Sequence, residues 1–146
     1  MMTSPILQPV AVLAAWSLVM WMWLYATRIP AMRASGMLAE PMVGTTGEDL
    51  RRRLPPAVQW KADNYNHLME QPTVFYAVAL LLAVSGQGDG LPARFAWLYV
   101  GLRIAHSLVQ AIGNRVPLRF VLHVLGTLPL IMLVVHALLT VFGGKR

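Results

Sequence analysis

The sequence predicts an all-α integral membrane protein built as a four-helix bundle. Of its 146 residues 57% are hydrophobic, and the mean hydropathy of +0.56 lies well above that of a soluble domain. Four apolar stretches, each long enough to cross a bilayer, alternate with segments rich in Gly, Pro and charged residues. By length and pattern the chain is a single membrane domain, residues 1–146.

Composition also narrows the chemistry. The chain has no cysteine, which excludes disulfides, thiolate metal sites and a cysteine nucleophile, so thiol chemistry would need a thiol supplied by a ligand. The net charge of +6 comes from basic residues scattered between apolar runs, without the interleaved aromatics of a nucleic-acid surface. We therefore expect no nucleic-acid partner and attribute the basic residues to membrane topology.

The first transmembrane helix is predicted at residues 5–27. Residues 1–27 carry no charged side chain, and Trp and Tyr gather in the second half of the stretch, as in the aromatic belt of a membrane interface. A cleaved signal peptide is the alternative interpretation. The stretch lacks a basic n-region and its apolar run is longer than an h-region, so we expect a retained helix.

Residues 28–62 are predicted to form a long cytoplasmic loop. They contain many Pro and Gly residues and half of the charged residues. A loop of this length in a compact domain is usually functional or ordered. We interpret its run Arg51-Arg52-Arg53 as a topogenic or lipid-headgroup feature and not as a ligand site.

Three further helices are predicted at residues 64–86, 93–113 and 118–142. The turn GQGDGLP joins the second helix to the third, and the short turn NRVP joins the third to the fourth, so these last two are antiparallel neighbours.

Orientation follows from the basic residues, because cytoplasmic loops are enriched in Lys and Arg. The first and third loops together hold eight of them: Arg28, Arg33, Arg51, Arg52, Arg53, Lys61, Arg115 and Arg119. The other side holds three: Arg94, Lys145 and Arg146. We therefore expect the first and third loops in the cytoplasm and both termini outside, in a multi-pass protein of a bacterial-type inner membrane.

Polar side chains line one face of three predicted helices at the cytoplasmic end, with the i, i+3, i+4 and i+7 spacing of a helix. They are Asp63, Asn66, His67 and Glu70 on the second helix, Arg103, His106 and Gln110 on the third, and Arg119 and His123 on the fourth.

Arg103 lies deep in its predicted span, roughly 16 Å from Asn114 on a straight helix. A central Arg facing lipid costs about 2.5–3.5 kcal/mol, and Glu70 is the only acidic residue inside any predicted span. We therefore predict a Glu70–Arg103 ion pair, which stabilises both charges and is compatible with ligand binding by the same groups.

The histidines allow a metal or haem site as an alternative. His67, His106 and His123 are predicted at a common depth, whereas His136 is expected to be a hydrogen-bonded core or interface residue. A metal site would need several of them aimed at one point, and no His-Glu-x-x-His motif is present. We expect no metal.

Two segments resemble the MAPEG family, the membrane-associated proteins in eicosanoid and glutathione metabolism. Residues 98–129, LYVGLRIAHSLVQAIGNRVPLRFVLHVLGTLP, are similar to the last two helices of the prostaglandin E synthase branch, and NHLMEQPTVFY is similar to the family's second-helix motif. Arg103, His106, Arg119 and Pro129 match the branch, and Glu70 corresponds to the motif's Glu. The chain departs from the motif in having Asp63, Asn66 and His67 near Glu70, and Phe120 and His123 in place of a hydroxyl residue and a tyrosine.

The resemblance implies a homotrimer with sites between subunits and glutathione as co-substrate of a transferase or peroxidase. A lipophilic electrophile would enter from membrane lipid. The implied glutathione-binding residues are Arg28, Asn66, His67, Glu70, Arg103 and His106, and the implied thiolate-stabilising residues are Arg119 and His123. A non-catalytic lipid-binding or scaffold protein of the same fold is the alternative function.

Overall fold

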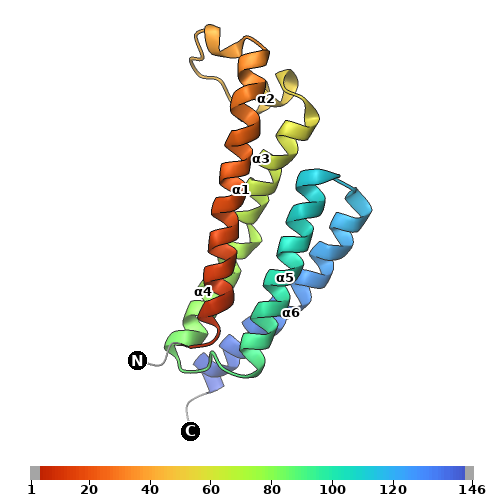
Figure 1. Ribbon diagram of the computed structural model, residues 1–146. Coiled ribbons are helices and arrows are strands. Elements are labelled where there is room, and N and C mark those ends of the chain that lie inside the picture. Colours follow the sequence, from red (N-terminus) through yellow and green to blue (C-terminus); the bar gives the residue numbers. More distant parts are fainter. Residues whose placement is uncertain (1–3, 144–146) are drawn as a thin grey trace.

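The computed structural model describes residues 4–143, and within them the chain is all-helical, with no strand. Its elements are α1 (Leu7–Ala34), the short 3-10 helix η1 (Met37–Ala39), α2 (Gly47–Arg53), α3 (Pro56–Leu68), α4 (Gln71–Val84), α5 (Leu91–Ile112) and α6 (Val116–Gly143). In Figure 1, α1 lies beside α3, and α5 and α6 form an antiparallel hairpin.

Four stretches are long and apolar enough to cross a bilayer: Leu7–Ala34, Pro56–Val84, Leu91–Ile112 and Val116–Gly143. They leave large apolar side chains exposed along their length, among them Phe120 and Leu139 on α6. A soluble protein rarely exposes apolar surface so continuously, whereas lipid or a neighbouring helix covers it favourably. The chain is thus an integral, multi-pass membrane protein.

The core of the bundle combines apolar packing with a buried polar junction. Phe75 of α4 and Tyr99 of α5 are fully buried and stack with ring centroids 4.6 Å apart. Ser107 of α5 accepts hydrogen bonds from Trp16 Nε1 of α1 at 3.0 Å and from Asn64 Nδ2 of α3 at 2.7 Å. One hydroxyl therefore fixes three helices relative to one another.

The predicted boundaries of the first helix and its loop are wrong. The helix continues through Pro30 to Ala34, and the predicted loop 28–62 is largely helical. A proline inside a helix removes one backbone hydrogen bond, but here the helix packs against α3, and tertiary packing outweighs that local loss.

The predicted second helix, residues 64–86, is in fact two helices. It begins earlier, at Pro56, and is interrupted after Leu68, with α4 starting at Gln71. Pro72 has no N–H to donate to the carbonyl of Leu68, and its ring would clash with that carbonyl in a continuous helix. Glu70, with φ −89° and ψ −99°, lies in the interruption.

Acidic and basic side chains order the segment between α1 and α3. Thr46 and Asp49 form a capping box at the start of α2. Arg53 donates two hydrogen bonds of 2.8 Å to the carboxylate of Glu40. This contact holds the pKa of the Glu40 carboxyl below its ordinary value, because the bound guanidinium stabilises the ionised form.

The opposite end of the bundle has one close backbone contact. Gly88, in the turn between α4 and α5, is buried and accepts a hydrogen bond from the backbone N–H of Ile6 at 3.1 Å. A Cβ at Gly88 would lie 2.1 Å from Ser4 Oγ and 2.6 Å from Ile6 Cγ2. Only glycine fits this turn.

Candidate functional site

A polar cavity of about 330 Å³ opens where α3, α5 and α6 meet, at the end of the bundle that carries α2. Its lining comes from four helices: Arg51, Asp63, Asn66, His67, Glu70, Gln110 and Arg119. The volume lies within the usual range for small-molecule sites.

Charged groups of both signs line this cavity and are partly paired. Arg51 Nη2 donates to Asp63 Oδ1 at 2.7 Å, and Arg51 Nη1 donates to Asp63 Oδ2 at 3.3 Å. Gln59 Nε2 donates to the same carboxylate at 3.2 Å, and Gln59 Oε1 accepts a hydrogen bond from Arg28 Nη2 at 3.4 Å. The short helix α2 is thereby tied to α3, and α3 to the end of α1.

Gln110 contributes an unused hydrogen-bond acceptor. The residue is only 5% exposed, and its Oε1 has no hydrogen-bond partner among residues 4–143. A buried amide oxygen without a partner is costly. Gln110 also lines the cavity.

A second cavity, of about 200 Å³, adjoins the first and is more apolar. It is lined by His67, His106, Val116, Arg119, Phe120 and His123. Arg119 and His67 line both cavities, so they lie at the boundary between a polar and an apolar compartment.

Local structure at the start of α6 holds Arg119 at this boundary. Its Nη1 donates to Oδ1 of Asn114, which lies in the turn between α5 and α6. Asn114 has a φ of +45°, a left-handed conformation that Asn adopts more readily than most residues. The turn thus places a fixed acceptor beside the guanidinium.

Arg103 lies beneath the cavities and is 2% exposed. Its Nη2 donates to the backbone carbonyl of His67 at 2.7 Å, and its Nη1 lies 3.3 Å from Nδ1 of His123. The carbonyl is available because the helix is interrupted just after it. Arg103 therefore joins the end of α3 to α6.

The predicted Glu70–Arg103 ion pair is wrong. Glu70 Oε2 instead contacts Nδ1 of His67 at 2.7 Å, and within residues 4–143 no carboxylate forms an ion pair with Arg103. The prediction assumed a continuous helix, whereas the break turns Glu70 toward the exposed side, where its side chain is 66% exposed.

Three histidines converge between α3, α5 and α6. The ring centroids of His67 and His106 are 4.9 Å apart, those of His67 and His123 5.4 Å, and those of His106 and His123 6.0 Å. One ring nitrogen from each lies within 4.8 Å of the others. These three residues, which the sequence places at a common depth, thus form a direct cluster.

Comparison with known proteins identifies the family: the MAPEG family model matches residues 6–139. The chain belongs to the MAPEG family. A search of curated proteins and a search of solved structures each found no match.

This MAPEG protein brings most of the predicted site residues together. The two cavities collect Asn66, His67, Glu70, His106, Arg119 and His123, with Arg103 directly behind them. Arg28 lines neither cavity and reaches the cavity wall only through Gln59.

Three lining residues were not predicted as site residues. Asp63 and Gln110 were on the predicted polar faces, and Arg51 was assigned to topology. The helical spacing that selected their neighbours was a sufficient signal for the first two. No sequence signal distinguished Arg51 from Arg52 and Arg53.

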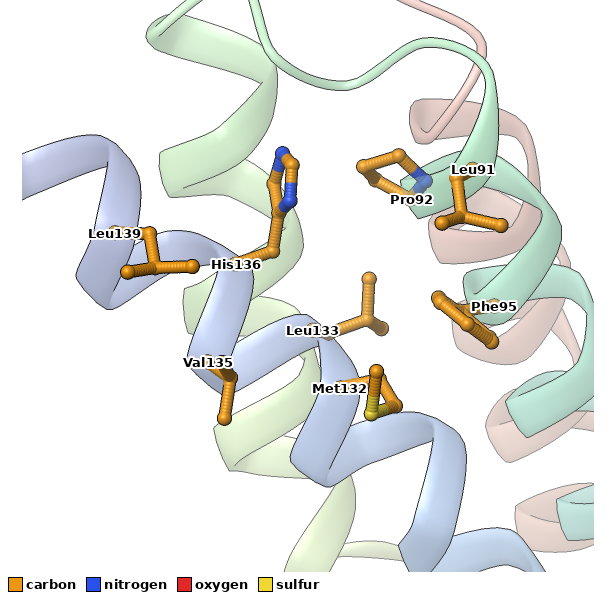
Figure 2. Close-up of a pocket in the computed structure, with 8 residues that line it drawn as sticks. All are labelled: Leu91, Pro92, Phe95, Met132, Leu133, Val135, His136 and Leu139. Atoms are coloured by element: carbon orange, nitrogen blue, oxygen red, sulfur yellow. The ribbon is translucent and has the colours of Figure 1, made fainter. Parts of the chain in front are cut away.

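His136 is separated from the other histidines. It lines an apolar cavity of about 120 Å³ between α5 and α6, at the opposite end of the hairpin. Figure 2 shows its ring on α6, across the cavity from Pro92 and Phe95 of α5. With one polar lining residue, this cavity offers space for an apolar group and no catalytic constellation.

Proposed function

We propose that this protein is a glutathione-dependent transferase or peroxidase that acts on lipophilic electrophiles, resembling the prostaglandin E synthase branch of its family. The observation that carries the proposal is the pair of adjoining cavities, one polar and one apolar, with Arg119 lining both. A polar thiol and an apolar partner would meet at that residue.

The polar cavity suits a zwitterionic peptide. Glutathione carries two carboxylates, one ammonium group and two amides. Arg51 and Arg119 are the cationic lining groups, Asp63 and Glu70 are the anionic ones, and Gln110 adds an amide side chain. Charge-assisted hydrogen bonds of this kind orient a peptide as well as bind it.

Arg119 would activate the thiol. A thiol titrates near pH 8.5, and an adjacent guanidinium lowers its pKa by about 1–3 units because it stabilises the thiolate. At neutral pH the share of thiolate, the nucleophilic form, would then rise from a few per cent to about a quarter or more. His123, in the apolar cavity with Arg119, would act as a second donor to the sulfur or to the electrophile.

The electrophile would enter from the bilayer. Phe120 and Val116 line the apolar cavity and are 66% and 58% exposed on α6, a helix apolar enough to face lipid. A substrate dissolved in the membrane would reach the thiolate without crossing water.

We also propose a cytoplasmic location for the α2 end of the bundle and a homotrimeric assembly. The basic residues of the first and third loops lie at this end, which favours the cytoplasm, where glutathione is abundant. A neighbouring subunit would close the open side of the polar cavity.

Isothermal titration of the purified protein with glutathione tests this function. We expect saturable binding at millimolar or lower concentration, with an ultraviolet thiolate signal at neutral pH. Arg119→Ala should weaken binding and lose at least about tenfold in the thiolate fraction of glutathione and in turnover. Arg115→Ala, which removes an exposed cation one turn earlier, is the control and should change neither.

Absence of glutathione binding at millimolar ligand would reject the enzyme. Native mass spectrometry would then distinguish the remaining function: copurifying lipid without a thiolate signal selects the lipid-binding or scaffold protein.

A further inference from the structure

We propose that His67, His106 and His123 form a binding site for a divalent transition-metal ion of the Zn²⁺ class. Its three histidines are also residues that the family resemblance implies for the glutathione site, and the proposal replaces the sequence expectation of no metal. Three imidazoles from three helices, α3, α5 and α6, face one point at the wall of the apolar cavity. Three protein ligands with an open fourth position are the usual arrangement of a catalytic zinc site.

The spacing of the rings is close to that of a coordination site. Zn–N bonds of about 2.0–2.1 Å in tetrahedral geometry place ligand nitrogens about 3.4 Å apart. In this protein the three nitrogens lie within 4.8 Å of one another, so modest side-chain rotations bring them onto one ion. His106, 2% exposed, is held by packing, while the rings of His67 and His123 are less buried and free to adjust.

Hydrogen bonding prepares two of the rings for this role. Nδ1 of His67 contacts the carboxylate of Glu70 at 2.7 Å, which places the proton on Nδ1 and leaves Nε2 as a lone-pair donor. A carboxylate behind a ligating histidine is the common second partner in zinc sites. The ring of His106 makes no hydrogen bond within residues 4–143, so both its nitrogens are available.

To bind the ion, His123 must exchange a contact with Arg103 for a bond to the metal. Its Nδ1 is 3.3 Å from Arg103 Nη1, a long hydrogen bond, and it must be released if Nδ1 binds the ion. Arg103 then keeps its shorter 2.7 Å bond to the His67 carbonyl. Arg103 therefore stays bonded to α3 while the imidazole changes partner.

The surrounding charges set the expected affinity and the identity of the ion. Arg103 and Arg119 oppose a cation, and Glu70 favours it, so we expect micromolar affinity and an anionic fourth ligand beside Arg119. Neutral imidazoles select Zn²⁺, Cu²⁺ or Ni²⁺ over Mg²⁺ and Ca²⁺, which prefer oxygen ligands.

The test is titration of the chelator-stripped, full-length protein with Zn²⁺, and with Co²⁺ as a spectroscopic probe, both without glutathione. We expect one ion per chain and the visible absorption of four-coordinate Co²⁺. Substituting His67, His106 or His123 with Asn should each weaken binding by at least about tenfold, and Glu70→Gln by about 10–100-fold. His136→Asn, in a histidine outside the cluster, should leave binding unchanged.

Two results would overturn the site: no saturable Zn²⁺ binding by the wild-type protein, or an equal loss of affinity in His136→Asn. If the cluster variants do not fold, X-ray absorption of the Zn²⁺-loaded wild type decides. Three imidazole nitrogens at about 2.0–2.1 Å support the site, and a shell of oxygen ligands rejects it. Because the Zn²⁺ titration is carried out without glutathione, failure of the proposed enzyme would leave this result intact.

Discussion

Replacing Gly88 with alanine tests whether the start of the chain is locked to the turn between α4 and α5. The added methyl would lie 2.1 Å from Ser4 Oγ, 2.6 Å from Ile6 Cγ2 and 3.3 Å from Ala83 Cα, so two segments must separate. Overpacking costs about 1–3 kcal/mol. Separation also stretches the 3.1 Å hydrogen bond from Ile6 N to Gly88 O, a further loss of about 0.5–1.5 kcal/mol.

The expected total destabilisation is therefore about 2–4 kcal/mol, which lowers Tm by roughly 5–15 °C for a chain of this size. Thermal unfolding in detergent measures it. Gly101→Ala is the matched control, because no atom outside the adjacent helix backbone lies within 4 Å of a Cβ there and alanine is favourable in a helix. An unchanged Tm for Gly88→Ala would refute the close contact of this turn with Ser4 and Ile6. A change in glutathione affinity would refute the independence of this contact from the polar cavity.

Three further outcomes follow from contacts at the other end and in the core. Arg51→Ala should weaken glutathione binding by about tenfold in calorimetry, whereas Arg52→Ala, outside the cavity, should have no effect. Ser107→Ala leaves the buried donor of Asn64 and the partly buried donor of Trp16 without their shared acceptor and should lower the free energy of unfolding by about 2–4 kcal/mol in chemical denaturation. The Glu40–Arg53 contact should persist above the ordinary pKa of the Glu40 carboxyl and be lost as pH falls through its depressed pKa, because protonation removes the acceptor charge. Amide exchange of residues 37–53 should then accelerate in acid. Unchanged exchange would contradict a stabilising role for this contact.

The fold was predictable because membrane insertion depends on composition over long windows. Apolar stretches of bilayer length identify spans regardless of local detail, and the four spans and the family assignment are confirmed. Boundaries depend on single prolines whose effect varies with context. Pro30 is accommodated inside α1, whereas Pro72 accompanies a break.

The candidate site was predictable to the extent that it depends on helical spacing. Asn66, His67 and Glu70 follow that spacing and do line the polar cavity. Pair contacts were not predictable, because they depend on the relative rotation of helices. Because the helix breaks after Leu68, Glu70 contacts His67, and Arg103 donates to the backbone carbonyl of His67 instead of pairing with Glu70. The position of Arg51 in the cavity depends on how α2 packs against α3, and the spacing of residues along the sequence does not predict that packing.

The break between α3 and α4 also sets the angular phase of the second span. Each residue of an α-helix advances the side-chain direction by about 100°, so the two non-helical residues between them, Met69 and Glu70, set the direction of the α3 side chains relative to those of α4. Inserting or deleting one residue here would rotate the polar face of α3 away from α5 and α6 while leaving the apolar packing of α4 in place. The length of this interruption therefore acts as a register element: it allows one membrane span to present a polar face in one half of the bilayer and an independently oriented apolar face in the other.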